Sequence, residues 1–128
     1  MLDHIGFAVS DYDRSLAFYS QALAPLGFGL IVELPREVTG GEVHAGFGRD
    51  GRPQFWIGTG AKLKGRLHVA FAAPSRQAVD AFHVAALKAG ATDNGGPGLR
   101  PHYHPNYYGA FVLDPDGHNV EAVCRAVE

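Results

Sequence analysis

The chain repeats itself at an offset of 64 residues, which is half of its length of 128 residues. Segment 4–23 aligns with segment 68–87 without a gap, and seven of the twenty aligned pairs are identical. Chance gives roughly one or two identities over such a length at ordinary composition. The identical pairs are His4/His68, Phe7/Phe71, Ala8/Ala72, Ala17/Ala81, Phe18/Phe82, Ala22/Ala86 and Leu23/Leu87. This repeat predicts a single domain, 1–128, built from two equivalent modules of about 1–62 and 63–128.

Composition and charge narrow the classes of protein to which the chain can belong. A hydrophobic fraction of 46% with 19% charged residues is typical of a soluble globular domain. The 11 basic and 13 acidic residues give a net charge of -2, so we expect no nucleic-acid partner and no membrane partner. The start of the chain shows no signal-peptide pattern, and the single Cys124 cannot form an internal disulfide, which favours a cytoplasmic protein. Any metal site must therefore use histidine and carboxylate ligands.

Each module is expected to begin with a short apolar strand that is followed by a helix. The first strands are predicted at His4–Val9 and Leu67–Ala73, with the two histidines in equivalent places. The helix of the first module is expected to end at Gly27; that of the second is capped by Ser75 and ends at Gly90. The remaining strands are predicted at Gly29–Glu33, Glu42–Gly48, Gln54–Ile57, Tyr107–Leu113 and Asn119–Val123. The pattern indicates an α+β fold in which a strand and a helix precede a run of antiparallel strands.

Three motifs, in order along the chain, give it a family resemblance. They are Asp3-His4-Ile5, the strand segment Leu67–Phe71, and the run Asp114–Glu121. Together they resemble the vicinal oxygen chelate superfamily, also called the glyoxalase/bleomycin resistance/dioxygenase superfamily. The resemblance covers essentially the whole chain. It implies two tandem βαβββ modules whose curved mixed sheets surround a cleft that holds one divalent metal ion.

The candidate metal ligands are His4, His68 and Glu121. The two histidines are repeat equivalents, so a twofold relation between the modules would bring them to one shared site, where Glu121 adds a hard oxygen ligand. Two imidazoles and one carboxylate suit zinc, nickel, manganese or iron, and they leave coordination positions open for substrate oxygens. The resemblance implies a glyoxalase-like enzyme of the lyase or isomerase type that acts on a small oxygenated substrate, with Glu121 also moving a proton.

The sequence departs from the best-known members at two positions. Aligning Asp50-Gly51 on Asp116-Gly117 places Phe55 opposite Glu121, where glyoxalase I enzymes usually carry a fourth ligand. This argues against methylglyoxal isomerisation, unless a one-residue bulge turns Gln54 inward to replace the missing ligand. Extradiol dioxygenases carry a tyrosine ten residues before the glutamate, where this chain has Phe111, so a dioxygenase-like activity stays an alternative only.

The segment from Gly96 to Tyr108 is rich in functional side chains for a loop that runs into a strand. We expect Arg100 to anchor a substrate carboxylate or phosphate, with His102 beside it as a second substrate-binding residue. His104 and Tyr108 are candidates for proton transfer near the metal. The alternative is a rigid proline-rich loop held by stacked aromatic rings.

Further candidates lie in the first module, and a second class of function remains open. Trp56, with Phe55, is a candidate floor of the substrate cleft, with plain core packing as the alternative. A metal-free protein of the bleomycin-resistance type, which sequesters a small ligand in the same cleft, is the alternative to an enzyme. We expect a homodimer in either case, with the ligand triad within one chain or shared between two.

Overall fold

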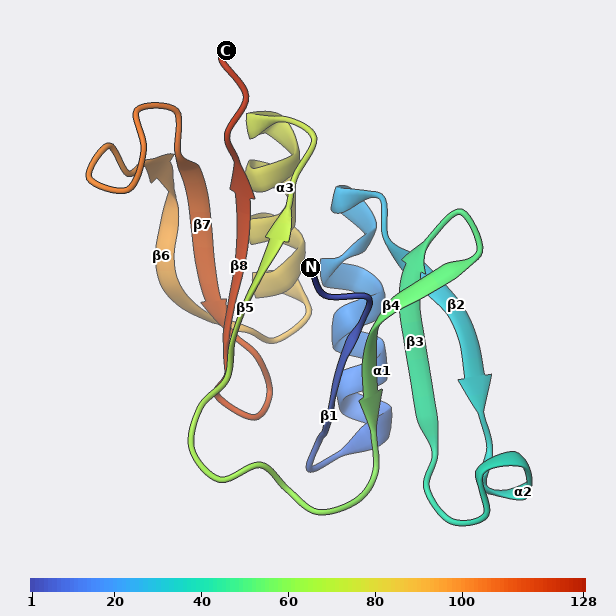
Figure 1. Ribbon diagram of the computed structural model, residues 1–128. Coiled ribbons are helices and arrows are strands. Elements are labelled where there is room, and N and C mark those ends of the chain that lie inside the picture. The colour runs from blue at the N-terminus through green and yellow to red at the C-terminus, as the bar shows by residue number, and fades with distance from the viewer.

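The computed structural model describes all residues, 1–128, and consists of two consecutive βαβββ modules (Figure 1). The first module contains β1 (Ile5–Ala8), α1 (Tyr12–Ala22), the short 3-10 helix η1 (Ala24–Leu26), β2 (Gly29–Leu34), the one-turn helix α2 (Arg36–Thr39), β3 (His44–Arg49) and β4 (Arg52–Gly58). The second contains β5 (His68–Ala72), α3 (Arg76–Lys88), β6 (Thr92–Leu99), β7 (Tyr108–Leu113) and β8 (Asn119–Cys124). The α+β class and the tandem repeat predicted from the sequence are confirmed.

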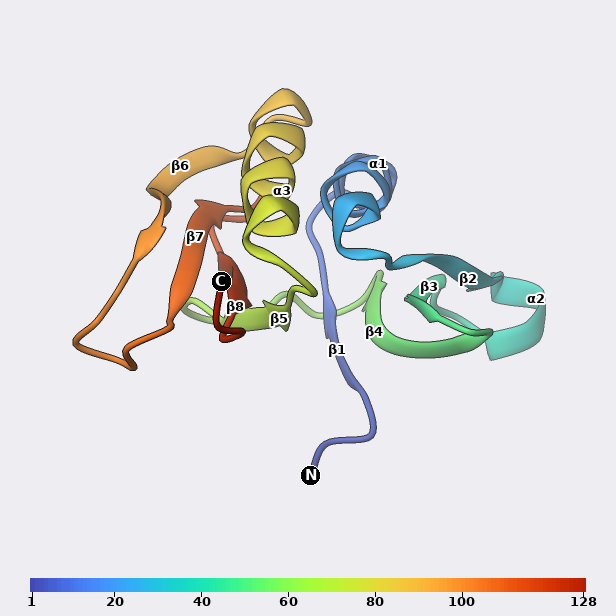
Figure 2. The ribbon, with the colours of Figure 1, turned by 90° about the horizontal axis from the view of Figure 1, so that it is seen from above.

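Each module forms its own four-stranded mixed sheet. The strand orders are β1-β4-β3-β2 and β5-β8-β7-β6, so the two sheets have the same topology. In both sheets the first strand pairs in parallel with the last strand, and the other pairings are antiparallel. Figure 2 shows α1 and α3 side by side on one side of the sheets. We call the opposite side of each sheet its open face.

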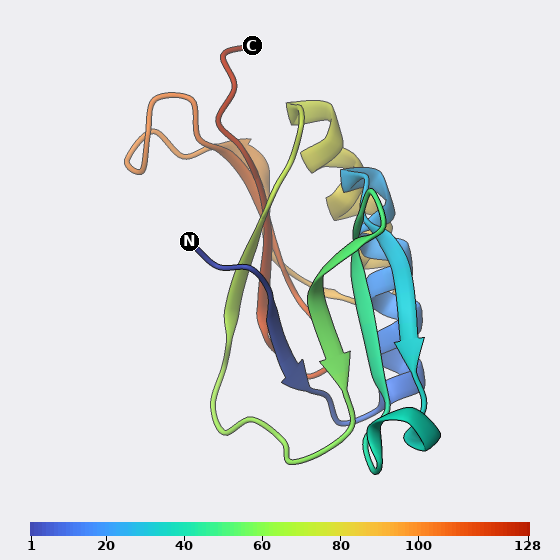
Figure 3. The ribbon, with the colours of Figure 1, turned by 45° about the vertical axis from the view of Figure 1, so that its right-hand side comes forward.

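The residues before β1 leave the sheet on the side away from the helices (Figure 3). Met1 and Leu2 are both exposed at the end of this arm. None of the helices is both long and apolar enough to cross a membrane.

Local sequence explains where the helices begin and end. Asp11 caps α1 by accepting a hydrogen bond from the Arg14 N–H at 3.1 Å, and Ser75 caps α3 in the same way. The α-helix of the first module ends at Ala22, earlier than expected, because the turn that follows contains Pro25 and is wound as η1. Gly27 then ends the helical segment with a φ of 84°, a conformation that favours glycine.

The core lies between the two helices and the two sheets. Its largest fully buried side chains include Phe18 and Tyr19 from α1 and Phe82 from α3. The Tyr19 hydroxyl donates a hydrogen bond to Asp114 Oδ2 at 2.5 Å, and Asp114 Oδ1 accepts the His118 N–H at 2.8 Å. This buried contact joins α1 of the first module to the β7–β8 turn of the second.

Two elements were not predicted from the sequence. Strand β6, Thr92–Leu99, lacks the alternation of apolar and polar residues that marks a strand, and three of its eight residues are glycine. It is an edge strand whose pairing with β7 shifts register twice, and glycine tolerates such irregularities. The other element is α2, a single helical turn that ends at Gly40. The predicted loop is therefore shorter than expected, because its first residues belong to β6.

Candidate functional site

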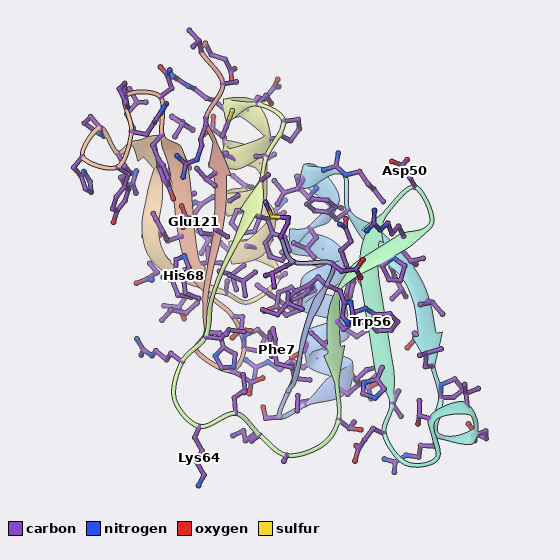
Figure 4. The ribbon with its side chains drawn as sticks, viewed as in Figure 1. Phe7, Asp50, Trp56, Lys64, His68 and Glu121 are labelled. Atoms are coloured by element: carbon purple, nitrogen blue, oxygen red, sulfur yellow. The ribbon has the colours of Figure 1, made fainter.

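His68 and Glu121 meet on the open face of the second sheet. Their strands, β5 and β8, are parallel neighbours, and the residues on either side of Glu121, Val120 and Ala122, point into the core. His68 Nε2 lies 3.1 Å from Glu121 Oε1, and Asn119 Nδ2 lies 2.6 Å from the other ring nitrogen of His68. The amide donates to His68 Nδ1, so the proton of the neutral ring is assigned to Nε2, which donates to the carboxylate. In Figure 4 these two side chains lie together on the second module.

Tyr107 holds the second oxygen of the Glu121 carboxylate. Its hydroxyl donates to Glu121 Oε2, while the carboxylate itself is only 2% exposed. Burial and the hydrogen bond to Glu121 raise the pKa of Tyr107 to about 12, so the phenol stays protonated as a donor. Gly109 makes room for this contact, because a Cβ there would lie 3.2 Å from Glu121 Oε2 and 3.1 Å from the Tyr107 ring. The carboxylate therefore sits in a cradle shaped for it.

The pair opens into a hollow of about 550 Å³ on the second sheet. We call it the second-sheet hollow; it is lined by His68, His102, Tyr103, Tyr107, Glu121 and Arg125, with Phe111 beside them. The rings of His102 and Tyr103 lie 4.1 Å apart and those of Tyr103 and Tyr107 lie 5.0 Å apart, so they form a continuous aromatic wall. The guanidinium of Arg125 lies over the Tyr107 ring, 4.9 Å from its centre.

His4 does not join His68 and Glu121 in a ligand set. Its Nδ1 lies 2.8 Å from Asp3 Oδ1, and its side chain is 60% exposed. The hydrogen bonds from His4 and then from Arg52 lower the pKa of Asp3. No group of three or more histidine, cysteine, aspartate or glutamate side chains in the chain is placed to hold a metal ion. Within one chain, the structure therefore brings together two of the three predicted ligands.

Trp56, and not Phe55, occupies the place in the first sheet that Glu121 occupies in the second. Gly6 pairs with Trp56 in the first sheet, just as its repeat equivalent Ala70 pairs with Glu121 in the second. Phe55 instead points into the core, where its ring lies 4.9 Å from the Tyr19 ring. The alignment of the two Asp-Gly turns predicted Phe55 at this position. It was wrong because β4 contains a bulge, which adds one residue between the Asp-Gly turn and the position equivalent to Glu121. The residue equivalent to Glu121 is therefore apolar, as expected, but it is Trp56.

Trp56 lies on the open face of the first sheet, beside a hollow of about 500 Å³ that also includes His4 and His44. We call it the first-sheet hollow. The indole lies close to Gly46, where a Cβ would be 2.9 Å from the ring, so glycine is needed beneath it. Gln54 is exposed and borders a different cavity, of about 340 Å³, which lies between the modules and which His4 and His68 also border. The bulge does not bring Gln54 to the position opposite Glu121.

Arg100 donates hydrogen bonds to backbone carbonyls. Its Nη1 donates to the Gly98 carbonyl at 2.8 Å and its Nη2 to the Gly96 carbonyl at 2.9 Å. The guanidinium also lies 5.4 Å from the centre of the Phe111 ring. Arg100 therefore satisfies carbonyls left open by the irregular strand β6, and its role as an anchor for a substrate anion stays a prediction.

Of the other candidates in the predicted loop, His102 lines the second-sheet hollow, and His104 and Tyr108 do not. His102 lines the second-sheet hollow, as expected of a substrate-binding residue. His104 Nδ1 accepts the Asn106 N–H at 3.0 Å and shapes the loop. The Tyr108 hydroxyl donates to Asp80 of α3 at 2.6 Å, on the helix side of the sheet, so it does not face Glu121. Neither His104 nor Tyr108 lines the second-sheet hollow, and both make contacts that support the structure of the second module.

Sequence reasoning missed Tyr107 and Arg125. Both line the second-sheet hollow with Glu121. Tyr107 directly precedes β7 and is an even number of residues from Gly109 and Phe111; Arg125 directly follows β8, four residues after Glu121. This period-2 pattern was present in the sequence. The pattern alone does not say which face of the sheet each residue occupies. The pairing of Phe111 with Glu121 in the structure shows this.

Comparisons with known proteins agree with this architecture. A family model described as the glyoxalase/bleomycin resistance protein/dioxygenase superfamily matches residues 1–122. A glyoxalase/bleomycin resistance protein from Albidiferax ferrireducens T118 is 27% identical, with a TM-score of 0.76 over 96% of this chain and 97% of that one. Glyoxalase I from Zea mays is 22% identical, with a TM-score of 0.72 over 95% of this chain and 45% of that one.

A family enzyme from Burkholderia phytofirmans PsJN is also similar in fold, at 22% identity and a TM-score of 0.69 over 97% of this chain and 98% of that one. A search of curated proteins found no match. The family match extends over nearly the whole chain and includes His4, His68 and Glu121. The chain belongs to the glyoxalase/bleomycin resistance protein/dioxygenase superfamily.

Proposed function

We propose that the chain is a glyoxalase-like enzyme of the lyase or isomerase type that uses one divalent metal ion and acts on a small oxygenated substrate in the second-sheet hollow. The buried carboxylate of Glu121 carries this proposal, because it is 2% exposed and yet reaches a hollow with His68 beside it. A buried carboxylate is costly unless it is paired. A carboxylate and an imidazole fixed side by side are a ligand pair for zinc, nickel, manganese or iron.

One chain supplies only part of a metal site. His68 and Glu121 fit two positions of the expected facial set, and His4, the third expected ligand, stands apart from them with Asp3. We propose that His4 of a second copy completes the set in a homodimer. The N-terminal arm supports this idea because it projects from the open face (Figures 2 and 3), and Met1 and Leu2 at its end are exposed.

The residues of this chain have separate tasks in the proposed reaction. Tyr107 fixes one oxygen of Glu121 by hydrogen bonding, and Asn119 orients the His68 ring. Glu121 is the group placed to accept and return a proton at a substrate carbon, because its side chain lines the hollow. A bound divalent metal would supply Lewis acidity toward the substrate oxygens.

The first-sheet hollow favours a second candidate function. Trp56 presents an indole above Gly46, and an aromatic surface of this kind binds flat apolar ligands without any metal. A metal-free protein that sequesters a small ligand there is therefore the alternative.

Metal titration separates the two candidates. Stripped protein is titrated with Zn²⁺, Ni²⁺, Mn²⁺ and Fe²⁺, and binding is followed by calorimetry and thermal stability. We expect about one equivalent per chain, lost in His4→Ala, His68→Ala and Glu121→Gln. His83→Ala is the matched control, because His83 lies on α3 and pairs with Asp93. No binding, or equal loss in the control, would favour the ligand-sequestering alternative.

Complementation between two variants tests the shared site. Chains carrying His4→Ala and Glu121→Gln are given different tags and co-expressed, and the mixed dimer is purified. A shared site leaves one intact ligand set per mixed dimer, formed by His4 of one chain and His68 with Glu121 of the other. A site within one chain leaves none. Half an equivalent per chain supports sharing, and no recovery contradicts it.

A further inference from the structure

Arg125 brings a full positive charge to the second-sheet hollow. The ion pairs of the chain join Asp3 to His4 and Arg52, His68 to Glu121, and His83 to Asp93. Arg125 takes part in none of them, and its side chain donates no hydrogen bond within the chain. All five of its N–H donors are therefore available to a ligand.

The guanidinium of Arg125 lies against the aromatic wall of the hollow. Arg125 lies 4.9 Å from the centre of the Tyr107 ring, and Tyr107 is itself tied to Glu121 by its hydroxyl. A guanidinium resting flat on a ring keeps its N–H edges free, and those edges match the two oxygens of a carboxylate. Tyr103 and His102 extend the wall, and His102 adds an imidazole at the mouth of the hollow.

Arg100 shows what a structural arginine looks like in the same module. It also packs on an aromatic ring, that of Phe111, but its donors are used by the carbonyls of Gly96 and Gly98. Arg125 has the same platform without the backbone partners. The contrast indicates that the donors of Arg125 are available to an anion, because no backbone carbonyl accepts a hydrogen bond from them.

The negative charge of Glu121 does not exclude an anion from this hollow. Its two oxygens accept hydrogen bonds from His68 and Tyr107, and the carboxylate is 2% exposed. Arg125, by contrast, is exposed at the rim of the hollow. A ligand that places its anionic end at Arg125 would carry its neighbouring atoms toward the His68–Glu121 pair.

We propose that Arg125 binds the carboxylate of the substrate, and that the substrate is a small 2-hydroxy or 2-oxo acid. This inference rests on the proposed function, which places the reacting oxygen at His68 and Glu121. The acid's carboxylate takes the bidentate edge of Arg125, with His102 donating beside it. The oxygen on its second carbon then faces the metal-ligand pair. A small acid of this class carries one polar group for each of the two polar regions of the hollow.

The test measures binding by metal-free protein and needs no turnover. Lactate and pyruvate are titrated into the ¹⁵N-labelled chain, with lactamide as a neutral probe of nearly the same shape as lactate. We expect saturable shifts of the Tyr107 and Arg125 resonances with the two acids at millimolar concentration. Lactamide should bind at least about tenfold more weakly, because it lacks the charge that strengthens these hydrogen bonds.

Three variants locate the binding. Arg125→Gln should weaken lactate binding by about tenfold or more, and Arg125→Lys should restore only part of it, since an ammonium cannot bind both oxygens in the arginine geometry. Arg14→Gln on α1 is the matched control and should bind as the unchanged chain does. Equal binding of lactate and lactamide, no binding of either acid, or an unaltered affinity in Arg125→Gln would overturn the inference.

The acid titration and the metal titration test separate proposals, so either proposal can fail without the other. If the acids bind through Arg125 but no metal binds, the carboxylate site stands and the metalloenzyme proposal fails. If metal binds at His68 and Glu121 but the acids do not depend on Arg125, only the substrate class is wrong.

Discussion

The hydroxyl of Tyr19 lies 2.5 Å from Asp114 Oδ2, so one buried hydrogen bond connects the helix of the first module to the last turn of the second. Both residues lie in the interior, where Tyr19 has no exposed surface and Asp114 is 5% exposed. Removing one partner leaves the other buried without its hydrogen bond, which is costly. This contact therefore makes the stability of each module depend on the other.

Replacing Tyr19 with phenylalanine should lower the free energy of unfolding by about 1–3 kcal/mol, the cost of leaving the buried Asp114 Oδ2 without its hydrogen bond. Urea unfolding measures this change. Tyr12→Phe is the control, because its hydroxyl bonds to Glu33 in an exposed position. An equal loss in both variants would contradict a special role for the buried bond.

The same pair predicts a loss of stability at alkaline pH. Burial, followed by the Asp114 carboxylate, raises the pKa of Tyr19 well above its usual value of 10.0. Above pH 10 the unfolded chain releases this proton while the folded chain keeps it, so the free energy of unfolding falls as pH rises. Below pH 10 the contribution is fully present.

The slope of stability against pH between about 10 and 11.5 should therefore be less steep in Tyr19→Phe than in the unchanged chain. The difference should approach that of one proton, about 1.4 kcal/mol per pH unit. Urea midpoints at several pH values measure both slopes. Identical slopes would show that Tyr19 ionises normally in the folded chain.

Tyr107→Phe should weaken metal binding at the proposed site by about 10–100-fold, because the phenol holds the Glu121 carboxylate in place. Calorimetric titration with Zn²⁺ measures the affinity. Tyr103→Phe is the control within the same aromatic wall, since no hydrogen bond joins Tyr103 to Glu121. Unaltered affinity in Tyr107→Phe would mean that Glu121 needs no positioning.

Gly109→Ala should lower the free energy of unfolding by about 1–3 kcal/mol, because the added methyl group presses on a packed site. The new Cβ would lie 3.1 Å from the Tyr107 ring and 3.2 Å from Glu121 Oε2. Gly29→Ala on β2 is the control, because a Cβ there meets nothing within 4 Å. Thermal and urea unfolding compare the two variants, and equal stability would show that the cradle is loose.

Phe55→Ala should cost about 3–5 kcal/mol of stability, as expected for a ring lost from a packed core. Trp56→Ala, on the open face, should cost less and should mainly weaken the binding of flat aromatic ligands. Urea unfolding, together with fluorescence titration using a naphthalene probe, separates the two effects. The reverse order of stability would contradict the register that places Trp56 opposite Gly6.

The sequence predicted the fold well because its repeat is carried by core residues. Phe18 and Phe82 are identical in the repeat and both are fully buried. The alignment of the two halves therefore identified residues of the core. Strand β6 escaped prediction because its structure comes from pairing with β7 and not from its glycine-rich sequence. Local patterns predict elements that bury an apolar face and fail for an edge strand held by its neighbour.

For the site, the sequence indicated which residues carry the chemistry, but it did not indicate which of their neighbours they contact. His68 and Glu121 came together as expected, since their strands are paired. Phe55 was placed wrongly because one bulged residue reverses the faces of a strand. Nothing in the sequence showed that the carbonyls of β6 would accept hydrogen bonds from Arg100, because the course of β6 depends on its pairing with β7.

Glu121 and Trp56 stand at equivalent places of the repeat, so the open faces of the two halves differ in their chemistry. The second half presents an acidic side chain with a tyrosine beside it, and the first half presents a flat ring above glycine. The two side chains line separate hollows, so a substitution at either place alters the lining of one hollow and leaves the lining of the other unchanged.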